Sequence, residues 1–196
     1  MIRTLVTLAI VGALVLVALL LLQPPGEEVA PLAIPTERTP IAVIEHSSTR
    51  QYGSEGRLQY LLKVDRAEQF LRYKNNKPLN FQRGYTDLAQ PELTIYAKDN
   101  EQPWVFRSKH GRTEHNGELI TLWGDVVVSQ SITDSDEYQV ATQKLEIYPE
   151  KQLVTTSEAV NIRTPEGIAS AVGLNINMLT GVSSLESQVQ GVYEPR

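Results

Sequence analysis

Apolar and polar residues alternate with a period of two along most of the chain beyond residue 41, which is the pattern of strands with one buried face. Leu58, Tyr60, Leu62 and Val64 show it clearly. The same pattern predicts strands at residues 93–97, 104–106, 119–129, 138–148, 152–163 and 167–178, separated by turn-forming residues. The segment 64–73 also fits a helix, but we assign it to a strand. The fold is therefore expected to be all-β.

Two of the predicted strands repeat one another. Residues 117–128 and 151–162 are similar at an offset of 34, with Leu119 matching Leu153. Each copy follows another predicted strand across a short turn, so the unit is a hairpin-like pair of strands. Stacked units of this kind give a jelly-roll or solenoid-like array. The first and last strands of such an array keep unpaired backbone groups, to which a partner strand can add.

A long apolar segment precedes the strands. Residues 4–22 carry no charge, and as a helix they would extend roughly 29 Å, close to the thickness of bilayer hydrocarbon. We interpret residues 1–22 as a transmembrane anchor rather than a cleaved signal peptide, because the apolar run is too long and only a weak cleavage site follows. Arg3 precedes the segment and two glutamates follow it, which predicts a cytoplasmic N-terminus and an exported C-terminal domain.

Proline content and charge set the remaining organisation. Five of the eleven prolines lie within residues 23–40, which predicts an extended linker before a domain at residues 41–196. The 18 basic and 23 acidic side chains give a net charge of −5, so no global positive field favours nucleic acid as a partner. The absence of cysteine excludes disulfides, thiolate metal sites and a cysteine nucleophile.

Candidate catalytic chemistry is not found. His110 and His115 are five residues apart, a spacing that puts both rings on one face of neither a helix nor a strand. The acidic residues at 134, 136 and 137 lack the pattern of a calcium loop. Nucleophile elbows, phosphate loops and dinucleotide fingerprints are also absent from the sequence. We expect no enzyme activity, no metal and no cofactor.

Residues 122–128, preceded by residues 104–111 and a turn, resemble the repeat of the lipopolysaccharide transport proteins, the LptA/LptC/OstA-like β-jelly-roll family. Residues 52–60, 90–94 and 189–195 are also similar to that family. With the N-terminal anchor, the chain resembles its single-span inner-membrane members over essentially its whole length. One departure is that Thr156-Ser157-Glu158 stands where the family often carries a second Leu-x-Gly turn.

The resemblance implies an open V-shaped β-jelly roll of stacked antiparallel strands, with one N-terminal transmembrane helix. It implies that lipopolysaccharide arrives from the LptF/LptG membrane pair, driven by the ATPase LptB, and passes to periplasmic LptA. The N-terminal edge and the transmembrane helix would face LptF/LptG, and the C-terminal edge would face LptA. The residues carried over to partner contacts are Gly56, Tyr60, Gly173 and Tyr193.

Alternate apolar residues would line a groove for acyl chains. The candidate lipid-contacting residues are Leu62, Val64, Leu88, Phe106, Ile120, Leu122, Val126, Val140, Ile147, Ile162 and Tyr193. About half should be ordinary core, because any two-layer β domain buries the same positions. Two other functions stay open: a membrane-tethered structural adaptor, and a periplasmic carbohydrate-binding module, for which two Trp and three Phe give little stacking surface.

Overall fold

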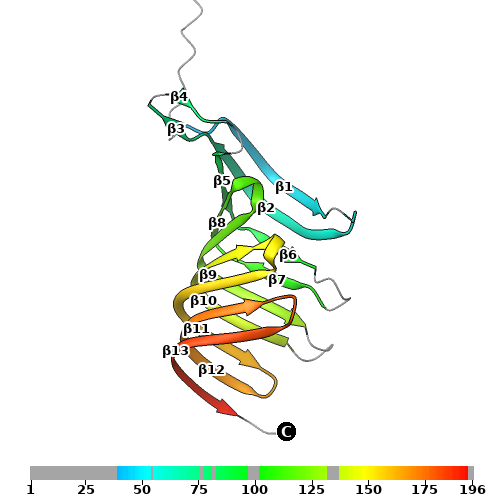
Figure 1. Cartoon of the computed structure of the whole chain (residues 1–196), viewed down its shortest axis with the longest axis vertical. Coiled ribbons are helices and arrows are strands. Elements are labelled where there is room, and N and C mark those ends of the chain that lie inside the picture. Colours follow the sequence, from blue (N-terminus) through cyan, green and yellow to red (C-terminus); the bar gives the residue numbers. More distant parts are fainter. Residues whose placement is uncertain are drawn as a thin grey trace, which may run out of the picture. The chain divides into compact units, whose positions relative to one another are not determined.

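The computed structural model of the chain describes residues 39–53, 55–75, 77–80, 83–96, 102–131 and 137–193. Within these ranges eleven strands form one sheet and two more form a small hairpin, and all pairings are antiparallel (Figure 1). The predicted all-β antiparallel fold is confirmed. Among the described residues no helix is long and apolar enough to cross a membrane, and the anchor predicted at residues 1–22 lies outside them.

The elements fall into long strands, short strands and two 3₁₀ turns. The long strands are β1 (Ala42–Tyr52), β2 (Leu58–Phe70), β9 (Leu119–Ser131), β10 (Glu137–Tyr148), β11 (Leu153–Thr164), β12 (Gly167–Asn177) and β13 (Val182–Tyr193). The short strands are β3 (Tyr73–Lys74), β4 (Lys77–Pro78), β5 (Tyr85–Ala89), β6 (Glu92–Ile95), β7 (Trp104–Arg107) and β8 (His110–Glu114). The 3₁₀ turns are η2 (His115–Gly117) and η3 (Pro149–Lys151).

The sheet is a simple meander if β5 with β6, and β7 with β8, are each counted as one long strand with a break in the middle. β5 and β6 both pair with β2, and β7 and β8 both pair with β9. β5 also pairs with β8, and β6 with β7, so the two broken strands lie side by side. The order is therefore β1, β2, β5–β6, β7–β8, β9, β10, β11, β12 and β13.

A line of irregular backbone crosses the middle of these strands. The breaks after β5 and β7 lie on it, and the register shifts between β9 and β10, β10 and β11, β11 and β12, and β12 and β13 continue it. Several residues here have positive φ: Gly124, Asp125, Gly173 and Gln188. Such bulges bend a strand sharply. In Figure 1 the long strands turn back on themselves beside the labels of β10, β11 and β13.

Hydroxyl side chains and backbone groups satisfy the carbonyls that these bulges free. Thr142 Oγ1 donates to the Ala159 carbonyl at 2.9 Å, and Thr156 Oγ1 donates to the Lys144 carbonyl at 2.6 Å. At the broken strands the Lys109 amide donates to the Gly124 carbonyl at 2.9 Å. Unpaired backbone groups at a bend would otherwise be costly, so these bonds explain why the bend persists across the sheet.

The bend divides the strands into two arms whose inner faces share one core. We define the β7 arm as the strand halves that lie on the same side of the bend as β6 and β7. It comprises β6, β7 and residues 58–63, 126–131, 137–142, 159–164, 167–171 and 189–193. The other halves, which include β5 and β8, form the β8 arm. Phe106 and Val128 from the β7 arm, and Ile120 and Leu122 from the β8 arm, belong to a single buried cluster.

The repeat seen in the sequence is a repeat of structure. β9 and β11 begin at Leu119 and Leu153, and the turns η2 and η3 directly before them begin at His115 and Pro149. Both pairs differ by the same offset of 34 residues. The segment 64–73, assigned to a strand, is one as far as Phe70, as part of β2.

Candidate functional site

Residues on the inner face of the β7 arm become more exposed from β10 toward β13, the C-terminal edge of the sheet. The register places Val140, Ile162, Ala169 and Gly191 side by side on β10 to β13. Val140 is fully buried, Ile162 is 8% exposed, Ala169 is half-buried and Gly191 is exposed. In the next row, Val189 of β13 is 56% exposed. In the β7 arm the apolar interior is therefore filled up to β11 and opens at Ala169 and Gly191, whereas Ala171, Leu174 and Ile176 of β12 remain buried.

Most candidate lipid-contacting residues lie in the filled part of the interior. Those buried in the shared cluster are Leu62, Val64, Leu88, Phe106, Ile120, Leu122, Val126, Val140, Ile147 and Ile162. Their inward orientation is as expected, but each packs against neighbouring side chains. A lipid would reach most of them only if the two arms moved apart. Tyr193, the remaining candidate, is 71% exposed at the end of β13.

A small concavity marks the open end of the interior. It has a volume of about 240 Å³, and its lining includes Ile162, Ala169, Gly191 and Tyr193. Position 191 has room for a side chain, because the atoms nearest to a Cβ added there would be the Ile168 carbonyl oxygen and Ala169, at ordinary contact distances of 3.4 Å or more. The structure thus brings together two of the predicted lipid-contacting residues, Ile162 and Tyr193.

The residues carried over to partner contacts lie in different environments. Gly56, with φ +72°, is exposed in the turn between β1 and β2. Tyr60 is buried, and its hydroxyl would lie 2.8 Å from a Cβ on Gly117, so its side chain is not available on the surface. Gly173 has φ +82°, and a Cβ there would clash with the Glu186 carboxylate. Gly173 therefore serves the bend of β12, since L side chains strongly disfavour this backbone geometry.

Both ends of the sheet are open edges. In the described part of the chain β1 pairs only with β2, and β13 pairs only with β12. Each edge strand exposes large apolar side chains; they are Val43, Ile44 and Tyr52 on β1, and Val182, Val189, Val192 and Tyr193 on β13. Edge strands of soluble domains are usually blunted by charge, proline or cover. Although β1 carries Glu45 and Arg50 and β13 carries Glu186, both strands also present unpaired backbone and large apolar side chains.

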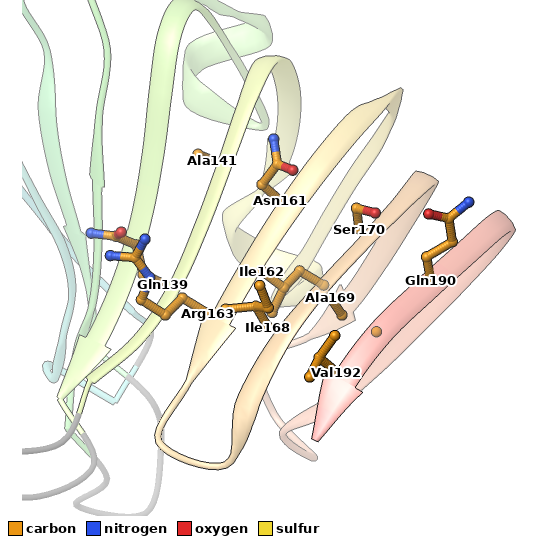
Figure 2. Close-up of a pocket in the computed structure, with 11 residues that line it drawn as sticks. Gln139, Ala141, Asn161, Ile162, Arg163, Ile168, Ala169, Ser170, Gln190 and Val192 are labelled. Atoms are coloured by element: carbon orange, nitrogen blue, oxygen red, sulfur yellow. The ribbon is translucent and has the colours of Figure 1, made fainter. Parts of the chain in front are cut away.

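A second concavity, of about 610 Å³, lies over β10 to β13 (Figure 2). By register, Gln139, Arg163, Ile168 and Val192 form one row of it, on the face opposite to Val140. In Figure 2, Gln139 and Arg163 lie at one end of the labelled side chains. Ile162 is the one predicted lipid-contacting residue among those that line it. This concavity is mixed in character rather than a continuation of the apolar interior.

Ion pairs on exposed or half-buried surface join neighbouring strands of the sheet. Glu92 of β6 pairs with Lys63 at 3.3 Å and Arg107 at 2.9 Å, and these two residues flank it on β2 and β7. The hydrogen bond from Arg107, followed by that from Lys63, lowers the pKa of the Glu92 carboxyl. Arg112 makes two bonds to Asp87, at 2.6 and 3.1 Å, and lies 4.0 Å from the centre of the Tyr85 ring. These pairs are structural.

Nothing in the described ranges resembles a metal centre. No group of three or more acidic or histidine side chains lies close enough there to hold a metal ion. His110 instead stacks on Trp123, with ring centres 6.0 Å apart, and His115 lies in the turn η2. Residues 134 and 136 lie outside the described residues.

Sequence reasoning missed four residues that shape the open interior. Val189 and Gly191 lie on β13, a strand that was not predicted, since its alternation is weak and most of its side chains are exposed. Trp104 and Tyr138 lie at the start of predicted strands, on the inner face of the β7 arm. The signal that could have identified them is the recurrence of Trp and Tyr at strand ends, where a buried surface meets solvent.

Comparisons with known proteins agree with this architecture. The LptH structure from Pseudomonas aeruginosa, described as the LptA homologous periplasmic component of the conserved lipopolysaccharide transport device, matches with a TM-score of 0.51. It covers 69% of this chain and 95% of that chain at 12% identity, which shows a shared fold. The lipopolysaccharide export system protein LptC of Escherichia coli K12 is 25% identical over 150 residues, as is that of Shigella flexneri. The match covers 76% of this chain and 73% of each relative.

The family model described as "Lipopolysaccharide-assembly, LptC-related" matches residues 7–194, nearly the whole chain. This confirms the resemblance noted in the sequence. It also confirms that the chain is not an enzyme, because the family is one of transport components. The chain belongs to the LptC-related lipopolysaccharide-assembly family, and its role is in lipopolysaccharide transport.

Proposed function

We propose that this chain is an inner-membrane-anchored, periplasmic component of the lipopolysaccharide transport machinery. It receives lipopolysaccharide from LptF/LptG, powered by LptB, and passes it to LptA along the apolar interior between its two arms. The observation that carries this proposal is the pair of open edges at the two ends of one continuous apolar core. A sheet with both ends uncovered is suited to stand between two partners.

Residues 1–22 would anchor the chain, residues 23–40 would tether it, and residues 41–196 would form the periplasmic domain. The uncharged run at 4–22 and the prolines that follow support this division. The small residues Ala9, Gly12 and Ala13 permit close approach of another helix, which would suit the membrane pair. The N-terminus would then be cytoplasmic.

Strand addition would join the domain to its partners. β1 would accept a strand of the LptF/LptG pair, near Gly56, and β13 would accept a strand of LptA, near Tyr193. Backbone hydrogen bonds give such contacts their affinity, and exposed side chains of the edge strand give them specificity. The apolar side chains on both edges support this mode of association, because an isolated domain gains nothing from exposing them.

The interior would carry the acyl chains. Burial of a chain is worth on the order of 10 kcal/mol at about 0.8 kcal/mol per methylene, so its transfer from bilayer to protein is close to an even exchange. Direction would then come from the ATPase. The opening at β12 and β13 supports release toward the LptA-facing edge, where Ile162 and Tyr193 line the interior. The other candidate residues would contact lipid when the arms separate.

One observation favours a second candidate. The interior between β2 and β11 is filled by the chain's own side chains, as expected of a structural adaptor that joins two complexes without carrying lipid. Such an adaptor would use the same edges.

Reconstitution separates the two functions. The full chain would be placed with LptB, LptF and LptG in lipopolysaccharide-containing vesicles, and transfer of labelled lipopolysaccharide to LptA would be followed with and without ATP. We expect ATP-dependent transfer, with lipopolysaccharide captured on this chain before it reaches LptA. Assembly of the complex with LptA without lipopolysaccharide on this chain would favour the adaptor.

A further inference from the structure

A row of amphipathic aromatic residues crosses the inner face of the β7 arm. The register places Tyr60 beside Ile95, Ile95 beside Trp104, Trp104 beside Gln130, and Gln130 beside Tyr138. Tyr60, Trp104 and Tyr138 therefore lie in one line at the margin of the arm farthest from the bend. We call these three residues the aromatic row.

The next row toward the bend is purely apolar. Leu93, Phe106, Val128, Val140 and Ile162 lie side by side there, and all are buried. The inner face thus changes from aliphatic and phenyl side chains to a row in which Tyr60, Trp104 and Tyr138 each carry one polar atom, with Ile95 and Gln130 between them. Tyr and Trp are favoured where an apolar region meets a polar one, as at the two interfaces of a bilayer.

The polar atom of Trp104 has no partner within the described residues. Trp104 is 3% exposed, and its indole Nε1 is buried without a hydrogen-bond acceptor. The Tyr138 ring packs edge-on against it, with ring centres 5.6 Å apart and an interplanar angle of 79°. A buried donor without an acceptor costs about 1 to 3 kcal/mol. An acceptor supplied by a ligand would recover that cost.

The two tyrosines of the row reach across to the β8 arm. The Tyr138 hydroxyl lies 3.5 Å from Ser183 Oγ, on the β8-arm half of β13. The Tyr60 hydroxyl points to Gly117, at the turn that leads into the β8-arm half of β9. Burial raises the pKa of both phenols, so both remain neutral donors at physiological pH. The Tyr138–Ser183 contact joins the two arms at the margin of the interior, next to the Trp104 ring against which Tyr138 packs.

We propose that the aromatic row binds an acylated lipid at the ester and amide groups that join its acyl chains to the headgroup. The Trp104 indole N–H donates to the carbonyl of one of these groups. This inference rests on the proposed function and adds the position at which the lipid is held. The methylene chain lies below the row, against Phe106 and Val128, and the sugar-phosphate headgroup stays outside. Tyr138 leaves Ser183 to admit the lipid.

The indole resonance of Trp104 gives a direct test. The chain has two tryptophans, and Trp123 lies on the outer face of β9, stacked on His110, so Trp123→Phe both assigns the spectrum and serves as the matched control. Full-length ¹⁵N-labelled chain in a maltoside detergent, which has no carbonyl group, would be titrated with hexa-acylated lipid A. A dialkyl ether phospholipid would be the second probe, because it offers alkyl chains without carbonyls.

We expect the Trp104 indole proton to move downfield with lipid A and not with the ether lipid. Trp104→Phe, which keeps a ring and removes the donor, should bind lipid A about fivefold more weakly, and Trp123→Phe should bind it as the unaltered chain does. An unmoved Trp104 signal while lipid A binds would overturn the inference and leave the proposed function standing. Absence of lipid A binding by the unaltered chain would overturn both. The indole signal decides the matter even if Trp104→Phe fails to fold.

The contact between Tyr138 and Ser183 is tested by a separate pair of variants. Ser183→Ala removes the partner of the Tyr138 hydroxyl and leaves the aromatic row intact, so we expect lipid A to associate severalfold faster. Ser184→Ala, on the same strand and also exposed, should leave the rate unchanged. Equal association rates for all three chains would show that this contact does not close the interior.

Discussion

Lys109 and Asp125 form an ion pair across the bend, with Nζ and Oδ2 2.5 Å apart. Lys109 lies in the break between β7 and β8, and Asp125 lies in the bulge of β9 beside Gly124. The hydrogen bond from Lys109 lowers the pKa of Asp125, and the same bond raises the pKa of Lys109. Both side chains are exposed, so the backbone of the bulge, rather than this pair, holds the bend.

Gly124→Ala should therefore destabilise the fold more than loss of the Asp125 charge. Gly124 has φ +79°, and an added Cβ would also lie 3.3 Å from the Lys109 Cβ. We expect a loss of about 1 to 2 kcal/mol in the free energy of unfolding. Asp125→Asn keeps a residue that tolerates positive φ and removes only an exposed charge, so it should leave the free energy of unfolding nearly unchanged. Urea unfolding followed by circular dichroism measures both, and an equal loss in the two variants would contradict this assignment.

Glu92 should make stability depend on pH. Its pKa is lowered from the ordinary 4.5 by the bond from Arg107, followed by that from Lys63. Since the folded-state pKa lies below the unfolded one, this contribution is complete above about pH 5 and disappears as pH falls through the lowered pKa. Glu92 is partly exposed, so Glu92→Gln should cost about 0.5 kcal/mol at pH 7. The cost should vanish in acid.

Thermal unfolding of the Glu92→Gln variant at pH 7 and at pH 3 measures this difference. Glu118→Gln, at an exposed turn position outside this chain of ion pairs, is the control. An equal loss of stability for Glu92→Gln at both pH values would exclude the ion pairs as its cause.

The two edges should be separable by mutation. Tyr52 at the end of β1 and Tyr193 at the end of β13 are both exposed, so alanine at either position should leave the unfolding temperature within about 2 °C. Tyr193→Ala should weaken crosslinking to LptA severalfold and spare LptF/LptG. Tyr52→Ala should do the reverse. Loss of both partners in each variant would argue against one partner for each edge.

Filling the open end of the interior should block transfer without harming the fold. Gly191→Val places a β-branched side chain beside Ala169, at a position with room for a Cβ. We expect unchanged or higher thermal stability and severalfold slower transfer of lipopolysaccharide to LptA. Gln190→Val, on the opposite face of the same strand, is the control and should transfer normally. Normal transfer by Gly191→Val would place the lipid path elsewhere.

The alternation of apolar and polar residues predicted the strands that have one buried and one exposed face. β2 and β9 to β12 are examples, because buried residues such as Tyr60 and Leu62, or Val140 and Thr142, recur at every second position with more exposed residues between them. β1 and β13 lack a clear pattern since they lie at edges with both faces exposed, and so they were not predicted. β5 and β8 were missed because each is only half of a broken strand.

The candidate site was harder to predict than the fold. Phe106 in a closed core and Phe106 in a lipid groove require the same apolar residue in the same alternation, so sequence pattern does not distinguish them. The structure shows how far each residue is buried: Phe106 is fully buried and Gly191 is exposed. Family resemblance indicated lipopolysaccharide transport, but it gave no reason to select Trp104. The indole N–H of Trp104 is seen to lack an acceptor among the described residues only once the chain is folded.

Site-specific photocrosslinking from two neighbouring positions on β7 tests most directly whether lipid passes between the arms. Phe106 points into the shared core, and Val105 points to the outer face of the same strand. With LptB, LptF, LptG and ATP present, a photoreactive residue at 106 should label lipopolysaccharide and one at 105 should not. Lipopolysaccharide labelled equally from both positions, or from neither while LptA still binds, would contradict a lipid path through the interior.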